Sequence, residues 1–218
     1  MYIVIIGAGE IGERVAKKAL EDGHDVVVVD ERKERCEGVI QKYDLMAIHG
    51  DPTNQDVLED ADVGEADALI STLDDPTNLM VDEMVKRMGT DLIISVARKP
   101  AARKMLKEKG VTTFGNPNDI TADYLYRAIH MPNIEDFLNL SGDTCIIKVS
   151  VPKDSGVEGK SSKKINEGEV LPKHTSLIVL ERGSEAIIPD EDVELKEGDI
   201  LTILTRESQI GDVVDTLS

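Results

Sequence analysis

The feature that most constrains the fold is a repeated alternation of short apolar runs with amphipathic segments over residues 1–130. The runs are rich in Val and Ile and too continuous to leave one face in water, which is typical of parallel strands covered on both sides. Between them, apolar residues recur at helical spacing with charged residues opposite. This repetition predicts right-handed crossovers and a doubly wound α/β domain with a parallel sheet. Strands are expected at Tyr2–Ile6, Asp25–Asp30, Leu45–His49, Ala68–Thr72, Leu92–Ala97 and Thr112–Phe114.

The pattern changes after Met131-Pro132. Residues 133–142 indicate a connector, and shorter alternating strands with a closing amphipathic helix follow from Asp143 onward. This half predicts a small α+β domain rich in strands. The expected division is a first domain at 1–132, a linker at 133–142 and a second domain at 143–218.

A GxGxxG motif follows the first expected strand and opens the first expected helix, and it consists of Gly7, Ala8, Gly9, Glu10, Ile11 and Gly12. In a Rossmann nucleotide-binding domain, Gly7 would permit the tight turn, Gly9 would admit a pyrophosphate, and Gly12 would let the helix pack closely. The phosphates would meet the unpaired N–H groups at the start of the helix. Asp30 ends the second strand and is expected to accept hydrogen bonds from the ribose hydroxyls. Its charge disfavours a 2′-phosphate, so NAD or an adenine nucleotide is expected rather than NADP.

Other expected strand ends lie on the same edge of the sheet, and their candidate site residues are Asp51, Pro52, Thr72, Leu73, Asp74 and Arg98. Asp51 could meet the adenine amino group. Asp51-Pro52 is also typical of a helix N-cap followed by proline at the first helical position. Arg98 could pair with phosphate, with a surface salt bridge as the alternative.

The charge balance restricts the partners. The chain has 25 basic and 43 acidic residues, a formal charge of −18. Such a surface repels phosphate backbones and anionic lipid, so nucleic acid and direct membrane insertion are not expected. No apolar stretch approaches the ~20 residues that cross a bilayer, and no leader-like segment precedes the first strand. Cys36 and Cys145 form no CxxC pair, so we expect reduced thiols in a soluble cytoplasmic protein.

With these residues, the chain resembles the TrkA-like regulatory subunits of Trk/Ktr potassium uptake systems, which carry N- and C-terminal RCK domains. The resemblance covers essentially the whole chain. The matching stretches are YIVIIGAGEIGERVA, VVVVDE, HGDPT, ADALISTLDDPTNLM, ISVARKP, VPKDSGVEGKSSKKI, SLIVLERGSEAIIP and LKEGDILTILTRESQIGDV. The chain departs from the family at Val96, where many members carry arginine, and at Ser162, where leucine is usual.

The resemblance implies a cytoplasmic regulatory subunit that gates a membrane-embedded potassium transporter or channel and lies at the membrane only through that partner. It also implies a homo-oligomer, a dimer or larger. The cofactor is expected to be NAD(H), with ATP or ADP as the alternative, since the family includes both preferences.

The alternative function is an NAD-dependent oxidoreductase acting on a small substrate. Such an enzyme needs an acid/base group beside the nicotinamide. The four histidines form no constellation, and the nearest metal candidates, Asp82 and Glu83, are helix neighbours that point to different faces. The sequence therefore favours a binding module over an enzyme, with no catalytic and no metal-binding residues.

Overall fold

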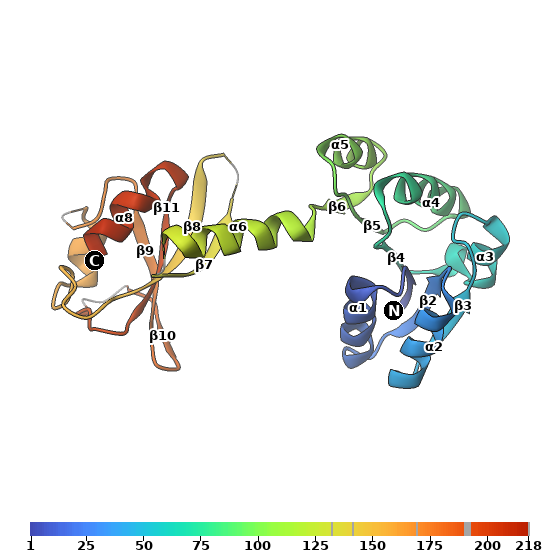
Figure 1. Cartoon of the computed structure of the whole chain (residues 1–218), viewed down its shortest axis with the longest axis horizontal. Helices are drawn as coiled ribbons and strands as arrows, with labels where there is room; N and C mark the ends of the chain where they lie inside the picture. Colours follow the sequence, from blue (N-terminus) through green and yellow to red (C-terminus); the bar gives the residue numbers. More distant parts are fainter. Residues whose placement is uncertain (132, 141, 169, 190–192, 218) are drawn as a thin grey trace. The chain divides into compact units, whose positions relative to one another are not determined.

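The computed structural model describes residues 1–131, 133–140, 142–168, 170–189 and 193–217, without the side chains of Arg127 and His130. The chain divides into two compact units, Met1–Asp119 and Ile120–Ser218 (Figure 1). The boundary expected at residue 132 lies outside the described residues. Helix α6, Pro117–His130, begins in the first unit and continues into the second.

The first unit is built on a six-stranded sheet in the order β3-β2-β1-β4-β5-β6, with every neighbouring pair parallel. The expected strands are confirmed to within a residue or so. They are β1 Tyr2–Ile6, β2 Asp25–Asp30, β3 Met46–His49, β4 Ala68–Ser71, β5 Ile93–Val96 and β6 Thr112–Phe114. The strand order reverses between β1 and β4, and in such sheets a crevice opens at that point, outside the carboxyl ends of the strands.

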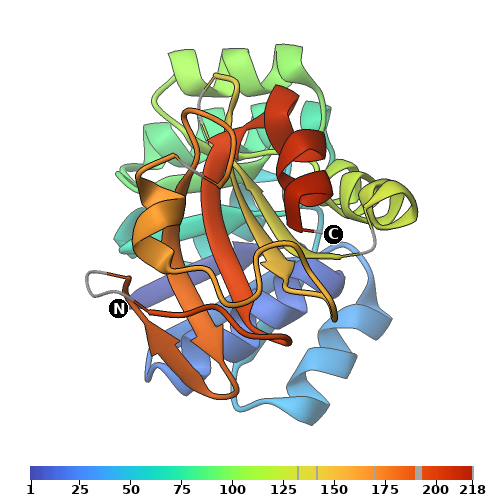
Figure 2. The ribbon, with the colours of Figure 1, turned by 90° about the vertical axis from the view of Figure 1, so that its left-hand side faces the viewer.

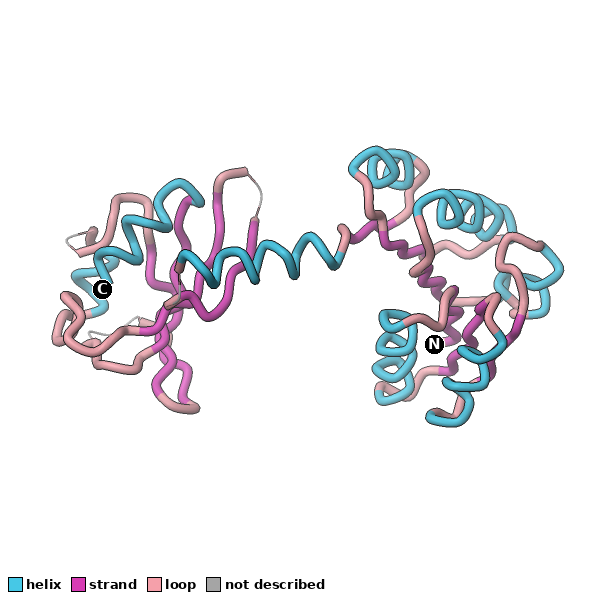
Figure 3. The backbone as a smooth tube through the Cα atoms, viewed as in Figure 1, coloured by secondary structure: helices cyan, strands magenta, loops and turns pink. Residues whose placement is uncertain are grey.

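Helices cover both faces of this sheet, as the continuous apolar strands require. Helices α1 and α2 pack on alternate residues of β1 and β2, such as Ile5 and Val28. The opposite face, with Val4 and Leu69, packs against α3, α4 and α5 (Figure 3). The helices are α1 Glu10–Glu21, α2 Lys33–Lys42, α3 Gln55–Asp60, α4 Asp75–Met88 and α5 Pro100–Glu108, with a 3-10 turn η1 at Val63–Glu65.

The face of the sheet that is covered by α3, α4 and α5 contains a buried carboxyl group, that of Asp82. Asp82 on α4 is 1% exposed, and the Ser95 hydroxyl donates a hydrogen bond to its Oδ2 at 2.6 Å. Its Oδ1 has no hydrogen-bond partner among the described residues. Burial raises the pKa of Asp82 to about 6 from its usual 3.8. The charged form is therefore the unfavourable one in the folded protein.

This pKa sets a pH dependence of stability. Because the folded state binds the Asp82 proton more tightly than the unfolded state, stability falls as pH rises from about 4 to about 6, by up to about 1.4 kcal/mol per unit. Asp82→Asn is expected to remove this decline and to raise the free energy of unfolding at pH 7 by about 1–3 kcal/mol. Urea unfolding of both proteins at pH 4.5 and pH 7 measures the difference, and equal pH slopes would contradict it.

The second unit is a five-stranded antiparallel sheet in the order β10-β9-β11-β8-β7. One face of this sheet packs with Ile165 of α7 and Ile210 of α8 in a single apolar core, and both helices are seen in Figure 2. The α+β prediction is confirmed. The elements are β7 Ile134–Asn139, β8 Thr144–Ser150, α7 Ser162–Asn166, β9 Ser176–Arg182, β10 Glu185–Ile187, β11 Ile200–Arg206, the 3-10 turn η2 Glu207–Gln209 and α8 Ile210–Leu217.

The structure corrects the prediction of a connector at residues 133–142. Most of it is β7, which pairs with β8 along the edge of the second sheet. A shift of register between Ile134 and Asp136 breaks the two-residue alternation of the strand. Phe137 is the one buried residue of β7. The sequence signal of a strand is therefore lost, although its hydrogen bonds are present.

Candidate functional site

The glycine turn joins β1 to α1 at the carboxyl edge of the first sheet. Gly7 has a φ of +100°, and a Cβ on it would lie 2.6 Å from the Thr72 hydroxyl of the neighbouring strand end. Its N–H donates to the Val29 carbonyl at 2.7 Å. Only glycine fits this combination of backbone angle and close approach.

Gly9 and Gly12 serve different purposes. Gly9 precedes α1 as its N-cap residue and makes no side-chain cap, so the first N–H groups of the helix lack a side-chain partner there. A Cβ on Gly9 would meet one atom within 4 Å, the Arg35 Nη1 at 3.8 Å. A Cβ on Gly12 would lie 1.8 Å from the Gly7 carbonyl oxygen. Gly9 therefore leaves open space above the helix, whereas Gly12 permits close packing below it.

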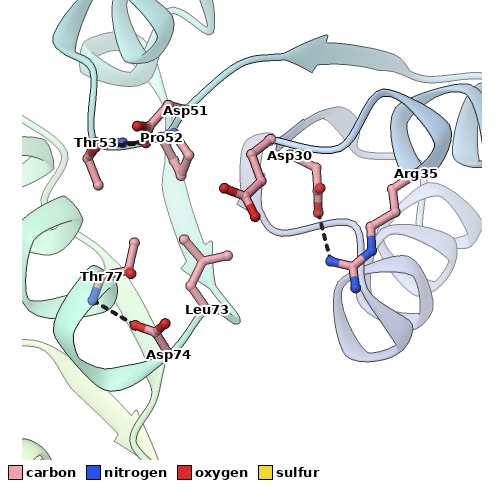
Figure 4. Close-up of a pocket in the computed structure, with 9 residues that line it drawn as sticks. Asp30, Arg35, Asp51, Pro52, Thr53, Leu73, Asp74 and Thr77 are labelled. Atoms are coloured by element: carbon pink, nitrogen blue, oxygen red, sulfur yellow. Dashed lines mark hydrogen bonds and ion pairs between the residues drawn. The ribbon is translucent and has the colours of Figure 1, made fainter.

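A hollow of 310 Å³ opens beside this turn, across the point where the strand order reverses. Its walls come from the end of β2, the turn after β3 and the turn between β4 and α4, as Figure 4 shows. The lining residues are Asp30, Glu31, Arg35, Asp51, Pro52, Thr53, Leu73, Asp74 and Thr77.

Asp30 is more heavily engaged than the sequence indicates. Its carboxylate is 2% exposed and accepts three hydrogen bonds. The Ala8 N–H donates to Oδ2 at 2.7 Å, the Arg32 N–H donates to Oδ1 at 2.8 Å, and Arg35 Nη1 donates to Oδ2 at 3.3 Å. Asp30 thus fixes the glycine turn as well as facing the hollow, and a ligand must share or replace these donors.

Asp51 and Asp74 form the opposite wall. The Thr53 hydroxyl and N–H donate to Asp51, and the Thr77 N–H donates to Asp74. These hydrogen bonds hold the pKa of each carboxyl below its usual value. Asp74 is the N-cap of α4, whereas Asp51 caps no helix, because α3 begins at Gln55 behind Asn54. The helix-cap interpretation of Asp51-Pro52 is wrong.

Sequence reasoning missed four lining residues, Glu31, Arg35, Thr53 and Thr77. Arg35 is the important one, because it is the single cation among nine lining residues that include four carboxylates. The stretch of mixed charge at residues 31–35, which follows Asp30, is its only signal in the sequence. Thr77 follows from the first turn of α4, where a residue three positions after the cap faces the same opening.

Eight predicted site residues lie outside the lining of this hollow. Four of them, Gly7, Ala8, Gly9 and Gly12, belong to the glycine turn beside it, and the other four are Glu10, Ile11, Thr72 and Arg98. Glu10 is exposed and pairs with Arg14 at 3.1 Å. Ile11 and Thr72 line a separate apolar hollow of 350 Å³. The Arg98 side chain is exposed, while its N–H donates to Asp75 at 2.7 Å. Arg98 still contributes, after the Thr77 hydrogen bonds, to lowering the pKa of Asp74.

No group of three or more His, Cys, Asp or Glu side chains within the described ranges is arranged to hold a metal ion. Both cysteines are free and buried. No helix in the described part of the chain is long and apolar enough to span a membrane.

The fold and the two-unit order define a class of protein. Residues 3–117 match the family model of the TrkA-N domain, and residues 146–218 match that of the TrkA-C domain. The chain is 31% identical over 223 residues to the Trk system potassium uptake protein TrkA homolog of Pyrococcus abyssi, covering 98% of this chain and 96% of the relative. The chain therefore belongs to the TrkA family of potassium uptake proteins.

Further relatives support the same assignment. The TrkA homolog of Methanothermobacter thermautotrophicus is 28% identical, and the match covers 96% of each chain. The TrkA protein of Halomonas elongata is also 28% identical, and the match covers 97% of this chain and 47% of that protein. Each of these relatives is named as a Trk system potassium uptake protein, which agrees with the interpretation of the chain as a regulatory rather than a catalytic protein.

Solved structures show the same fold. The GsuK RCK domain superposes with a TM-score of 0.66 at 20% identity, covering 100% of this chain and 47% of that chain. The GsuK channel bound to NAD superposes with a TM-score of 0.67 at 22% identity, covering 100% of this chain and 39% of that chain. The expected RCK architecture is confirmed.

Proposed function

We propose that this chain is a nucleotide-binding regulatory subunit of a potassium uptake system. The nucleotide binds in the 310 Å³ hollow, and its binding changes the conductance of a membrane-embedded potassium transporter or channel. The observation that carries the proposal is the glycine turn beside Asp30, at the carboxyl edge of a parallel sheet, in a chain of the TrkA family.

The geometry of the turn supports the nucleotide. The open space at Gly9 lies over the start of α1, where N–H groups and the helix dipole favour a phosphate. Asp30 lies at the end of the neighbouring strand, in position for a ribose. Pro52 and Leu73 supply an apolar surface in a hollow whose other lining residues are polar or charged. NAD(H) is the first candidate, and ATP or ADP remains the alternative because Asp30 suits the ribose of each.

Self-association is the second part of the proposal. Helix α6 exposes large apolar side chains, among them Ile120 at 56%, Leu125 at 67% and Ile129 at 75%. The first unit also carries the apolar hollow of 350 Å³ around Ile94 and Phe114. Apolar surface of this kind is removed from water when a second copy packs on it. In a dimer or larger assembly the subunits can pack in two arrangements. The nucleotide shifts the balance between these arrangements only if it binds one of them more tightly than the other.

Calorimetric titration of the purified chain with NAD, NADH, ATP and ADP tests the binding, and light scattering with and without the tightest ligand tests the assembly. We expect one class of nucleotide to bind, a dimer or larger species, and scattering or crosslinking that changes with ligand. A monomer that binds none of the four nucleotides would contradict the proposal. Association with the membrane partner is then measured with and without that nucleotide.

A further inference from the structure

Asp30 and Arg35 form an ion pair inside the hollow, and the pair stands where a ligand has to fit. The Arg35 side chain is 41% exposed, whereas the Asp30 side chain is 2% exposed. Figure 4 shows the guanidinium lying against the carboxylate. Of the three donors to Asp30, two are backbone N–H groups fixed by the turn and by the end of β2. Arg35 makes the longest of the three bonds, at 3.3 Å, and its side chain can rotate away.

The guanidinium also lies beside the phosphate position. Its Nη1 is 3.8 Å from the point that a Cβ of Gly9 would occupy, which is the space the glycine leaves open above α1. Arg35 belongs to the first turn of α2 and therefore reaches toward the start of α1 from the neighbouring helix.

The charge of the hollow adds a third argument. Four of its nine lining residues are carboxylates, and Arg35 is the one cation among these described residues. Without Arg35, every charged side chain that lines the hollow would be negative and would repel an anionic ligand. Arginine matches phosphate oxygens with two parallel N–H donors, so it suits this task better than a lysine would.

We propose that Arg35 is the phosphate-binding residue of the site and that it changes partners when a ligand enters. Without nucleotide it pairs with Oδ2 of Asp30. With nucleotide bound it donates to the 5′-phosphate, and Oδ2 of Asp30, which keeps the Ala8 N–H, accepts a ribose hydroxyl in place of Arg35. This inference rests on the proposed nucleotide-binding function. It restricts the ligand class to adenine nucleotides that carry at least one 5′-phosphate. A nucleoside would break the ion pair between Asp30 and Arg35 without offering Arg35 a new hydrogen-bond acceptor.

The test compares AMP, NAD and adenosine by calorimetry on the full chain and on Arg35→Gln. Loss of one charge-assisted hydrogen bond should weaken AMP and NAD by about 10- to 100-fold. Adenosine should bind wild type weakly and should bind Arg35→Gln no worse. Arg35→Lys keeps the charge but lacks the planar guanidinium, so its affinity for AMP and NAD should lie between those of wild type and Arg35→Gln. Lys33→Gln removes the same charge from the same helix at an exposed side chain that pairs with Glu37, and it should leave all three affinities unchanged.

The outcomes separate the two proposals. Unchanged AMP affinity in Arg35→Gln would overturn the role of Arg35 while the nucleotide site stands. Equal losses for AMP and adenosine would also overturn it, because they would show that Arg35 only supports the fold of the site. A wild-type chain that binds none of AMP, NAD, NADH, ATP and ADP would overturn both proposals.

Discussion

Gly9→Val is expected to abolish nucleotide binding and to leave the fold intact. The backbone at Gly9 has φ −72° and ψ −175°, which any residue can adopt, and the structure shows open space around the added Cβ apart from Arg35. A valine side chain would fill the volume that the phosphates need above α1. We expect affinity to fall by more than about 100-fold, and stability to change by less than about 1 kcal/mol.

Calorimetry with the nucleotide that wild type binds most tightly measures the loss, and thermal unfolding checks the fold. Gly9→Ala is the matched control, since its Cβ would make an ordinary contact at 3.8 Å with Arg35 and occupy less of the phosphate space. Its affinity should lie between those of wild type and Gly9→Val. Wild-type affinity in Gly9→Val would place the phosphates elsewhere and would count against the site.

Gly12→Ala, unlike Gly9→Val, should cause a large loss of stability. A Cβ at this position would lie 1.8 Å from the Gly7 carbonyl oxygen and 2.9 Å from its carbon, both of them backbone atoms. Helix α1 would have to move away from the turn and from the core that it covers. We expect the free energy of unfolding to fall by about 3 kcal/mol or more.

Gly38→Ala provides the comparison for this change. Gly38 lies within α2, and nothing lies within 4 Å of its added Cβ. The same substitution should therefore stabilise the protein there, by up to about 1 kcal/mol, through better helix propensity. Urea unfolding of the two variants should give effects of opposite sign. A Gly12→Ala protein as stable as wild type would show that α1 does not pack as the structure describes.

The sequence predicts the first sheet well because its central strands are apolar on both faces, as in β1 and β2, and because some helices have a clear stop, as at Gly89 after α4. It predicts the glycine turn because a short motif carries it, although Gly7 itself is required by contacts with Val29 and Thr72, which are distant in the sequence. The sequence does not predict β7, because the register shift before Phe137 hides its period and its pairing with β8 is not local.

The candidate site is predicted only in part, for the same reason. Asp30, Asp51 and Asp74 follow from the rule that strand ends meet at one edge of a parallel sheet. The rule gives positions but not the directions of side chains. It therefore does not show that Glu10 points away or that Arg35 reaches back over Gly9. Nor does it show that the Asp30 carboxylate accepts three hydrogen bonds within the chain.

The start of α4 is fastened to the neighbouring strand ends. The Ser71 hydroxyl donates to the buried Asn78 side chain, which donates in turn to the Val96 carbonyl at 2.8 Å. The Asp75 carboxylate accepts from the N–H groups of Arg98 and Lys99 at 2.7 and 2.9 Å. These two amides lie in an exposed turn, yet they exchange with solvent hydrogen only when Asp75 releases them. Their exchange rates therefore report, for a protein in solution, whether a ligand in the hollow moves α4.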